Sequence, residues 1–244
     1  MANTNVLAKY GIKEVADVTF YKIDDNGNPT YPVLYLDTLK VSTIEQTAET
    51  AEARGGKGNP ALISWDYGKE ITVTLEDALF SAKSMSVMFG DGTVKSSDTT
   101  IRKTIEFTGA TKPTTVEIAG NTYKFNDVKV YDIATGEEVT TPVANTRYFA
   151  TGNVAIEDVS SIEISGNSFP GTYYVTGDTY ARSFTTGDDE LFQFQIMKAK
   201  VTSENTITLE AEGDPSVFNM SLKVLRDDKG QMMKLVKYSM KSEG

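Results

Sequence analysis

The side chains that could do chemistry in this chain are its carboxylates, because the sequence contains neither histidine nor cysteine. Asp188-Asp189-Glu190 and Glu137-Glu138 are runs of adjacent acids, and a pair of carboxylates facing a sugar is the machinery of a glycosidase. Such a pair must stand close together in a cleft, which the spacing of acids along a chain does not indicate. We therefore interpret both runs as solvated loop charges.

The absence of histidine and cysteine excludes several kinds of functional site at once. A Ser-His-Asp triad and a Cys-His pair cannot be built, and neither can a zinc site or an iron–sulfur cluster with His or Cys ligands. Disulfides are excluded too, so the fold must depend on packing. We predict that the chain is not an enzyme and binds no metal or cofactor.

The glycine-rich stretch Arg54-Gly55-Gly56-Lys57-Gly58-Asn59 invites comparison with a phosphate-binding loop. The pattern G-x-x-x-x-G-K-[ST] requires glycine five positions before the second Gly, and Ser or Thr directly after the Lys. The chain has Ala51 and Gly58 at these positions, so the motif fails twice. We interpret the stretch as a flexible turn with two cations.

Acidic residues outnumber basic residues by 34 to 24, which gives a formal charge of −10 and a pI near 4.7. A negative surface repels the phosphates of nucleic acids, so tight binding to DNA is not expected. No window approaches the ~18 consecutive apolar residues of a membrane span. The N-terminus lacks the features of a signal peptide, so we expect a protein made without export.

Most of the sequence alternates short runs of β-branched and aromatic residues with turn signals about every 8–12 residues. This spacing predicts an all-β fold with one short helix, built as an antiparallel sandwich or barrel. The expected strands are Val15–Ile23, Tyr31–Leu36, Leu62–Trp65, Ile71–Leu75, Val116–Ile118, Thr122–Phe125, Val128–Ile133, Ser161–Ile164, Thr172–Val175, Thr179–Phe184, Leu191–Val201, Phe218–Val224 and Met232–Tyr238.

Glycine marks each of the expected turns, in several cases next to Asn or Asp, because these residues tolerate positive φ. The first of them, Asp24-Asp25-Asn26-Gly27-Asn28, resembles the start of a calcium loop but has Pro29 at the sixth position and Tyr35 at the twelfth, so we interpret it as a hairpin turn. The other predicted turns lie at Gly68, Gly120-Asn121, Thr135-Gly136-Glu137, Thr176-Gly177-Asp178, Thr186-Gly187-Asp188 and Asp227-Asp228-Lys229-Gly230.

One helix is predicted over Glu76–Phe89. Thr74 followed three residues later by Asp77 has the spacing of a capping box, and Gly90 is placed as a C-terminal cap. The helix either covers an open edge of the sandwich or lies partly against a neighbouring subunit. The residues for such a subunit contact are Phe80, Met85, Met88 and Phe89.

Two segments allow more than one interpretation. Ile44–Arg54 is rich in Ala and Glu, which favours helix by propensity, but it follows a β-like run and has no apolar stripe. It is a helix, a solvated hairpin arm or a mobile loop. In Leu191–Val201 the apolar phase flips after Ile196, which indicates either a β-bulge or a strand that leaves one sheet and enters a different interface.

Several stretches together resemble the tail tube proteins of tailed bacteriophages. They are Arg54–Pro60 followed by Leu62–Glu70, the run Ile71–Phe89, and Glu210-Ala211-Glu212-Gly213-Asp214-Pro215 with Phe218–Arg226. The likeness covers roughly residues 1–110 and 166–244. It leaves out residues 111–165, which we interpret as a small β-rich insertion.

The resemblance implies a two-sheet β-sandwich whose hexameric rings stack into a hollow virion tail tube, assembled in the host cytoplasm. DNA and the tape-measure protein would pass through the lumen without tight binding. Sheath, tail terminator and baseplate proteins are further expected partners, and no membrane is. Loop Arg54, Gly55, Gly56, Lys57, Gly58 and Asn59 would contact the next ring. A net negative lumen is expected, lined by Thr206, Thr208 and Glu210.

Two alternatives remain open from the sequence. A tube protein of a non-viral contractile injection system shares the architecture but tends to be smaller. A carbohydrate-binding or adhesin-like β-sandwich is the other, although an adhesin usually shows export and an exposed aromatic platform.

Overall fold

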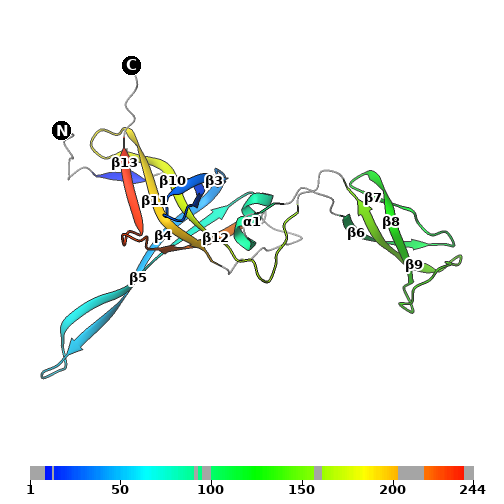
Figure 1. Ribbon diagram of the computed structural model, residues 1–244, viewed down its shortest axis with the longest axis horizontal. Coiled ribbons are helices and arrows are strands. Elements are labelled where there is room, and N and C mark those ends of the chain that lie inside the picture. The colour runs from blue at the N-terminus through cyan, green and yellow to red at the C-terminus, as the bar shows by residue number, and fades with distance from the viewer. Residues whose placement is uncertain are drawn as a thin grey trace, which may run out of the picture. The chain divides into compact units, whose positions relative to one another are not determined.

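The computed structural model describes residues 9–12, 14–90, 93–94, 100–156, 161–202 and 217–238 (Figure 1). The fold is mostly β with one short helix and antiparallel sheets, and the strands of the larger sheet enclose a core in the expected sandwich-like arrangement. The chain divides into two compact units, residues 1–93 with 162–244 and residues 94–161. The smaller unit thus begins ahead of residue 111, because Thr100–Thr108 is paired along its whole length with Arg147–Ala155.

The larger unit contains one sheet with the strand order β3-β2-β10-β11-β12-β5-β4, in which β1 also pairs with β10 and β13 with β11. All of these pairs are antiparallel. The elements are β1 (Tyr10–Ile12), β2 (Asp17–Ile23), β3 (Pro29–Leu36), β4 (Leu39–Arg54), β5 (Ala61–Asp77), α1 (Ala82–Phe89), β10 (Thr172–Ser183), β11 (Asp189–Val201), β12 (Phe218–Leu225) and β13 (Met233–Tyr238).

One hydrophobic core lies inside this unit, and strands from both ends of the sheet contribute to it. Phe20 of β2, Val73 of β5 and Met220 of β12 are fully buried there. Val87 and Met88 of α1 join the same core, so the helix covers an otherwise open side of it. The alternation of apolar and polar residues along these strands produces the arrangement, because successive side chains point to opposite faces.

The hairpin of β10 and β11 lies at the centre of the sheet. The outer edge of each of these two strands pairs with two other strands, one along each half of its length. Along β10, β1 pairs with Ala181–Ser183 and β2 with Tyr173–Asp178. Along β11, β13 pairs with Leu191–Ile196 and β12 with Lys198–Val201. The change of partner in β11 coincides with a one-residue bulge in β11, since Val175 faces Ile196 while Tyr173 faces Ala199. The bulge interpretation of the phase flip is therefore confirmed, whereas β11 does not leave its sheet and changes only the strand it pairs with.

Gly177 lies within β10 and does not form the predicted turn at Thr176-Gly177-Asp178. It faces Phe194 of β11, and a Cβ at Gly177 would lie 2.1 Å from the Phe194 ring. The glycine therefore makes room for a buried aromatic ring, which is a common reason for glycine inside a strand. The next signal, Thr186-Gly187-Asp188, does form the turn between β10 and β11, with φ +76° at Gly187.

The turn between β2 and β3 is also confirmed. The Asp24 carboxylate accepts hydrogen bonds from the backbone N–H groups of Asn26 and Asn28 at 2.9 and 2.8 Å. These bonds, that of Asn28 foremost, lower the pKa of Asp24, and Gly27 takes φ +80°. The turn therefore depends on contacts within five residues, which explains why its sequence signal is reliable.

The helix is shorter than predicted, because residues 71–77 pair with β12 and cannot begin a helix. Thr74 is therefore not the capping residue. Ser81 takes that role, since its Oγ accepts from the Ser84 backbone N–H at 2.9 Å and the Ser84 Oγ accepts from the Ser81 N–H at 3.0 Å. The capping box is thus present, seven residues later than expected, and Gly90 ends the helix as predicted.

The smaller unit is a four-stranded antiparallel sheet with the order β6-β9-β8-β7. Val116, Phe125 and Val154 form one of its buried clusters, and Val130, Tyr148 and Ala150 form the other. The predicted strand Ser161–Ile164 is absent from the described residues, whereas β6 and β9 lacked a strong sequence signal. The strands are β6 (Thr100–Thr108), β7 (Thr115–Ile118), β8 (Asn121–Asp132) and β9 (Arg147–Ala155).

Gly177→Ala is expected to lower the free energy of unfolding by about 1–3 kcal/mol, because the added methyl group overpacks a buried site beside Phe194. Gly11→Ala is the matched control, since Gly11 also lies in a strand but no atom comes within 4 Å of the place its new methyl group would take. Urea denaturation of both variants measures the difference. Equal stabilities would contradict the packing role of Gly177.

Candidate assembly interface

The long hairpin of β4 and β5 extends away from the rest of the larger unit (Figure 1). Its strands pair from Leu39 and Asp77 near the core to Arg54 and Ala61 near the tip. Residues 45–52 and 61–70 are exposed on both faces. We call residues 47–70 the arm. Ile44–Arg54 is therefore a strand in a solvated hairpin, because cross-strand pairing overrides its helical propensity.

The tip of the arm consists of the predicted contact loop, Arg54, Gly55, Gly56, Lys57, Gly58 and Asn59. Gly56 and Gly58 both have φ +85°, and the backbone N–H of Asn59 donates to the Gly56 carbonyl at 3.1 Å. The Nε of Arg54 donates to Glu52 at 2.8 Å. The structure thus places a defined turn with an exposed lysine at the far end of the arm.

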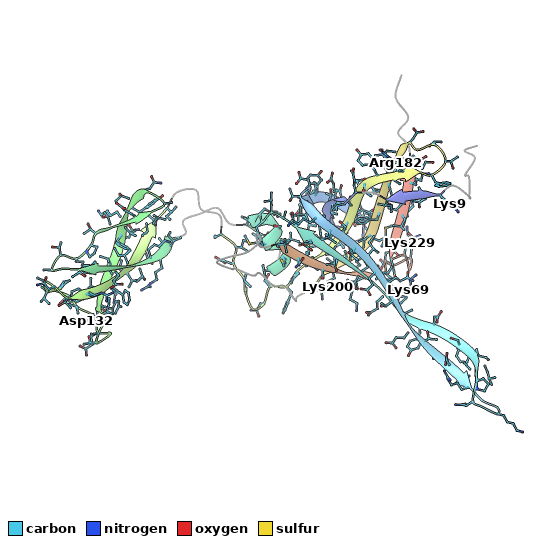
Figure 2. All side chains as sticks on the ribbon, turned by 180° about the vertical axis from the view of Figure 1, so that it is seen from behind. Lys9, Lys69, Asp132, Arg182, Lys200 and Lys229 are labelled. Carbon is cyan, nitrogen blue, oxygen red and sulfur yellow. The ribbon has the colours of Figure 1, made fainter. Side chains whose placement is uncertain are left out.

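Gly68 forms a bulge in β5 and not the predicted hairpin turn. Thr47 faces Glu70 while Glu49 faces Tyr67, so β5 contains one residue more than β4 at this point. Gly68 has φ +63°, the left-handed conformation typical of glycine in such a bulge. The neighbouring Lys69 is labelled in Figure 2 where the arm leaves the body.

The bulge determines which face of the arm is apolar. Ile63, Trp65 and Tyr67 alternate along β5 and face Ala53, Ala51 and Glu49 of β4. Paired residues share a face, so these three large side chains and the two alanines form one surface, which we call the arm face. Trp65 is 54% exposed and Tyr67 53%. Trp65 thus lies outside the core, on this exposed surface.

The four helix-end residues proposed as a subunit contact are only partly available to a neighbour. Met88 is fully buried, and Met85 and Phe89 pack against the core of the same unit. Phe80 is 37% exposed and its ring stands edge-on to Phe218 at 5.5 Å between centroids. A contact between subunits at this end remains a prediction for Phe80, because the methionine inside the core cannot reach a neighbour.

Strands β1, β10, β11 and β13 form a four-stranded strip with one polar face. On that face Gln193 donates to the Asp178 carboxylate at 2.7 Å, and the Tyr238 hydroxyl lies 3.4 Å from the same carboxylate. Desolvation, followed by the Asp178 charge, raises the pKa of Tyr238. Arg182 and Asp189 form a two-bonded ion pair at 2.7 Å. This face is suited to contact with water.

The predicted lumen residues Thr206, Thr208 and Glu210 lie outside the described residues. By strict alternation along β11, Lys198 and Lys200 would share the face of Phe192, Phe194 and Ile196. The bulge in β11 corrects this for Lys200, because Ala199 and Val201 continue the core face after the bulge and Lys200 is exposed on the other.

Comparison with known protein families identifies the kind of protein that has these surfaces. The sequence pattern of the YomU/Tube protein family matches residues 10–235. The chain belongs to this family. The match supports the resemblance to phage tail tube proteins, and it identifies a structural component of the virion tail that assembles into a tube. No curated protein matches the chain.

The tube protein matches a family of structural proteins, not one known for catalysis. In the part of the chain that the structure describes, no group of acids could hold a metal ion. Within the same residues, no helix has the length and apolar character needed to cross a membrane.

Trp65 is the single tryptophan of the chain, so its fluorescence reports on the arm. In the unassembled subunit we expect a red-shifted emission that acrylamide quenches nearly as well as in urea, because the indole is half exposed. A blue-shifted, poorly quenched emission in the unassembled subunit would show that the arm folds back onto the body.

Proposed function

We propose that the tube protein forms hexameric rings that stack into the hollow conduit through which the phage genome leaves the capsid. The observation that carries this proposal is the pair of free strand edges on the β1-β10-β11-β13 strip. Among the described residues, β1 pairs only with β10 and β13 only with β11. Each strip therefore presents one open edge on either side.

Open edges expose unpaired backbone groups and invite pairing with another chain. If β13 of each copy pairs with β1 of the next, a closed ring leaves no edge of the strip unpaired. By contrast, the β3 edge contains Pro29 and Pro32, which hinder such pairing. These features support ring closure through the strip.

The polar face of the strip is the proposed lumen wall. In its described part, Asp178 and Asp189 are accompanied by Arg182 and Lys234, and Lys200 adds one further cation at the end of β11. The whole chain carries a charge of −10, which disfavours adhesion of DNA phosphates. This net negative charge of the whole chain supports the passage of DNA and the tape-measure protein without tight binding.

The arm is the proposed contact between successive rings, with its glycine-rich tip at the far end. Its length and two-sided exposure support this role, since nothing in the described part of the same chain covers it. The remaining proposed partners are the proteins that would cap or surround such a tube, namely the tail terminator, the baseplate and a sheath. Assembly in the host cytoplasm is part of the same proposal.

Self-association tests the proposed function. At high protein concentration we expect hexameric rings or longer polymers in analytical ultracentrifugation, and hollow tubes in negative-stain micrographs. The physical reason is the pairing of exposed strand edges into a closed ring. A species that stays monomeric at every concentration and salt tested would overturn the proposal.

Deleting Gly55–Gly58 is expected to spare the fold but to shorten or abolish tubes, because the tip lies far from the core and is exposed. Circular dichroism and thermal unfolding serve as controls for the fold, and tube length in micrographs is the measurement. Tubes of normal length from this variant would remove the tip from the stacking contact.

A further inference from the structure

The arm face is an apolar surface on the exposed arm of the β4–β5 hairpin. Ile63, Trp65 and Tyr67 are each more than half exposed, and they lie in one row because they alternate along β5. Large exposed apolar surfaces of this kind mark interaction sites in proteins that are otherwise well packed. Trp and Tyr are also the residues most enriched at the energetic centre of interfaces.

The bulge at Gly68 keeps the arm face away from the protein's own core. Ile71 and Val73 of β5 face the core, and in an unbulged strand Tyr67 and Trp65 would share that face. The extra residue reverses the relation, so that the arm face continues the outer side of the hairpin. The sequence thus uses a glycine in the left-handed region to present this surface outward.

A matching apolar surface lies at the base of the same hairpin, on either side of Ile44. One groove, of about 390 Å³, runs between β4 and the segment after β1, with Phe192 and Phe194 in its lining. Ile12 at 55%, Val15 at 39% and Ile44 at 42% leave its rim exposed. An opening to buried aromatic rings is therefore left uncovered in the single chain.

A second groove, of about 410 Å³, lies on the other side of Ile44 and is bounded by β5 and β13. Ile71, Met233 and Leu235 line it, and Leu235 is 59% exposed. Lys69 and Gln46 are its polar residues, so the groove carries a positive charge and no acid. We call the two together the Ile44 grooves.

The polar groups of the two surfaces are complementary. The Oγ of Ser42, in the wall of the first groove, is buried and has no hydrogen-bond partner among the described residues. The Trp65 indole N–H and the Tyr67 hydroxyl can each donate, and both need a partner once they are buried. Glu49 stands beside Tyr67 on the arm face. Its negative charge is complementary to the positive charge of Lys69 in the second groove of another copy.

We propose that the arm face of one copy docks into the Ile44 grooves of a second copy. The proposal rests on the proposed function and specifies which surfaces meet between successive rings. The donor and receptor surfaces differ, so the contact is heterologous and repeats from copy to copy along the tube. It buries on both sides the apolar side chains that a single chain leaves in water.

The chain has no cysteine, so single cysteines can map the contact without background. Protein with the single substitution Ala51→Cys on the arm face is mixed with protein that has the single substitution Val15→Cys or Leu235→Cys on a groove rim. Each mixture is allowed to assemble and is then mildly oxidised. Glu52→Cys is the matched control, because Glu52 is the next residue on the same strand and points to the opposite face. Non-reducing electrophoresis measures the cross-linked dimer.

With at least one of the two groove variants, Val15→Cys or Leu235→Cys, we expect Ala51→Cys to give several-fold more cross-linked dimer than Glu52→Cys gives with the same variant. Tubes that form normally but cross-link equally from both positions, or from neither, would overturn the docking proposal and leave the tube function intact. A parent protein that never assembles would overturn both.

Deletion of Gly68 provides an independent check. Removing the extra residue shifts the register by one and turns Tyr67, Trp65 and Ile63 to the core side of the hairpin. We expect this variant to keep the circular dichroism spectrum of the parent and to lose tubes. If this variant forms tubes as readily as the parent protein, the direction in which the arm face points does not matter for assembly, and the docking proposal is contradicted.

Discussion

The larger unit depends on the pairing of β10 with β11. Each of the two strands carries two further strands on its outer edge, so every other strand of the sheet is joined to this hairpin directly or through its neighbours. The pairing brings Phe194 over Gly177, where a side chain of any size would collide with the ring. Close packing at the centre of the hairpin thus allows both halves of the sheet to share one core.

Two bulges then decide which surfaces the sheet buries and which it shows. In β11 the apolar residues change phase after Ile196, and the bulge cancels the change, so that Ala199 and Val201 return to the core. In β5 the apolar residues keep one phase from Ile63 to Leu75, and the bulge at Gly68 separates them. One extra residue therefore keeps a strand in the core in the first case and turns its apolar row outward in the second.

The larger unit has a packed core of its own, but its surface leaves strand edges unpaired and apolar side chains exposed. The strip of β1, β10, β11 and β13 ends in open edges, and the arm and the grooves beside Ile44 leave apolar side chains in water. Each of these features is a liability in a lone molecule and a contact in an assembly. Membership of the YomU/Tube protein family agrees with the second interpretation.

The sequence by itself determined the class of fold, the family and the turns whose hydrogen bonds are local. The turn at Asp24–Asn28 and that at Thr186-Gly187-Asp188 could be predicted because their carboxylates, hydroxyls and glycines act on the next few residues. The absence of histidine and cysteine likewise ruled out whole classes of chemistry without any structure.

Only the tertiary structure decided the roles of Gly177 and Gly68, both of which look like turns in sequence. One faces an aromatic ring from the neighbouring strand, and the other adds a residue against a partner about twenty positions away. The helix start moved to Ser81 for the same reason, since β12 pairs with the residues that would have formed its first turn. Cross-strand pairing joins residues distant in sequence, and a local pattern does not contain that information.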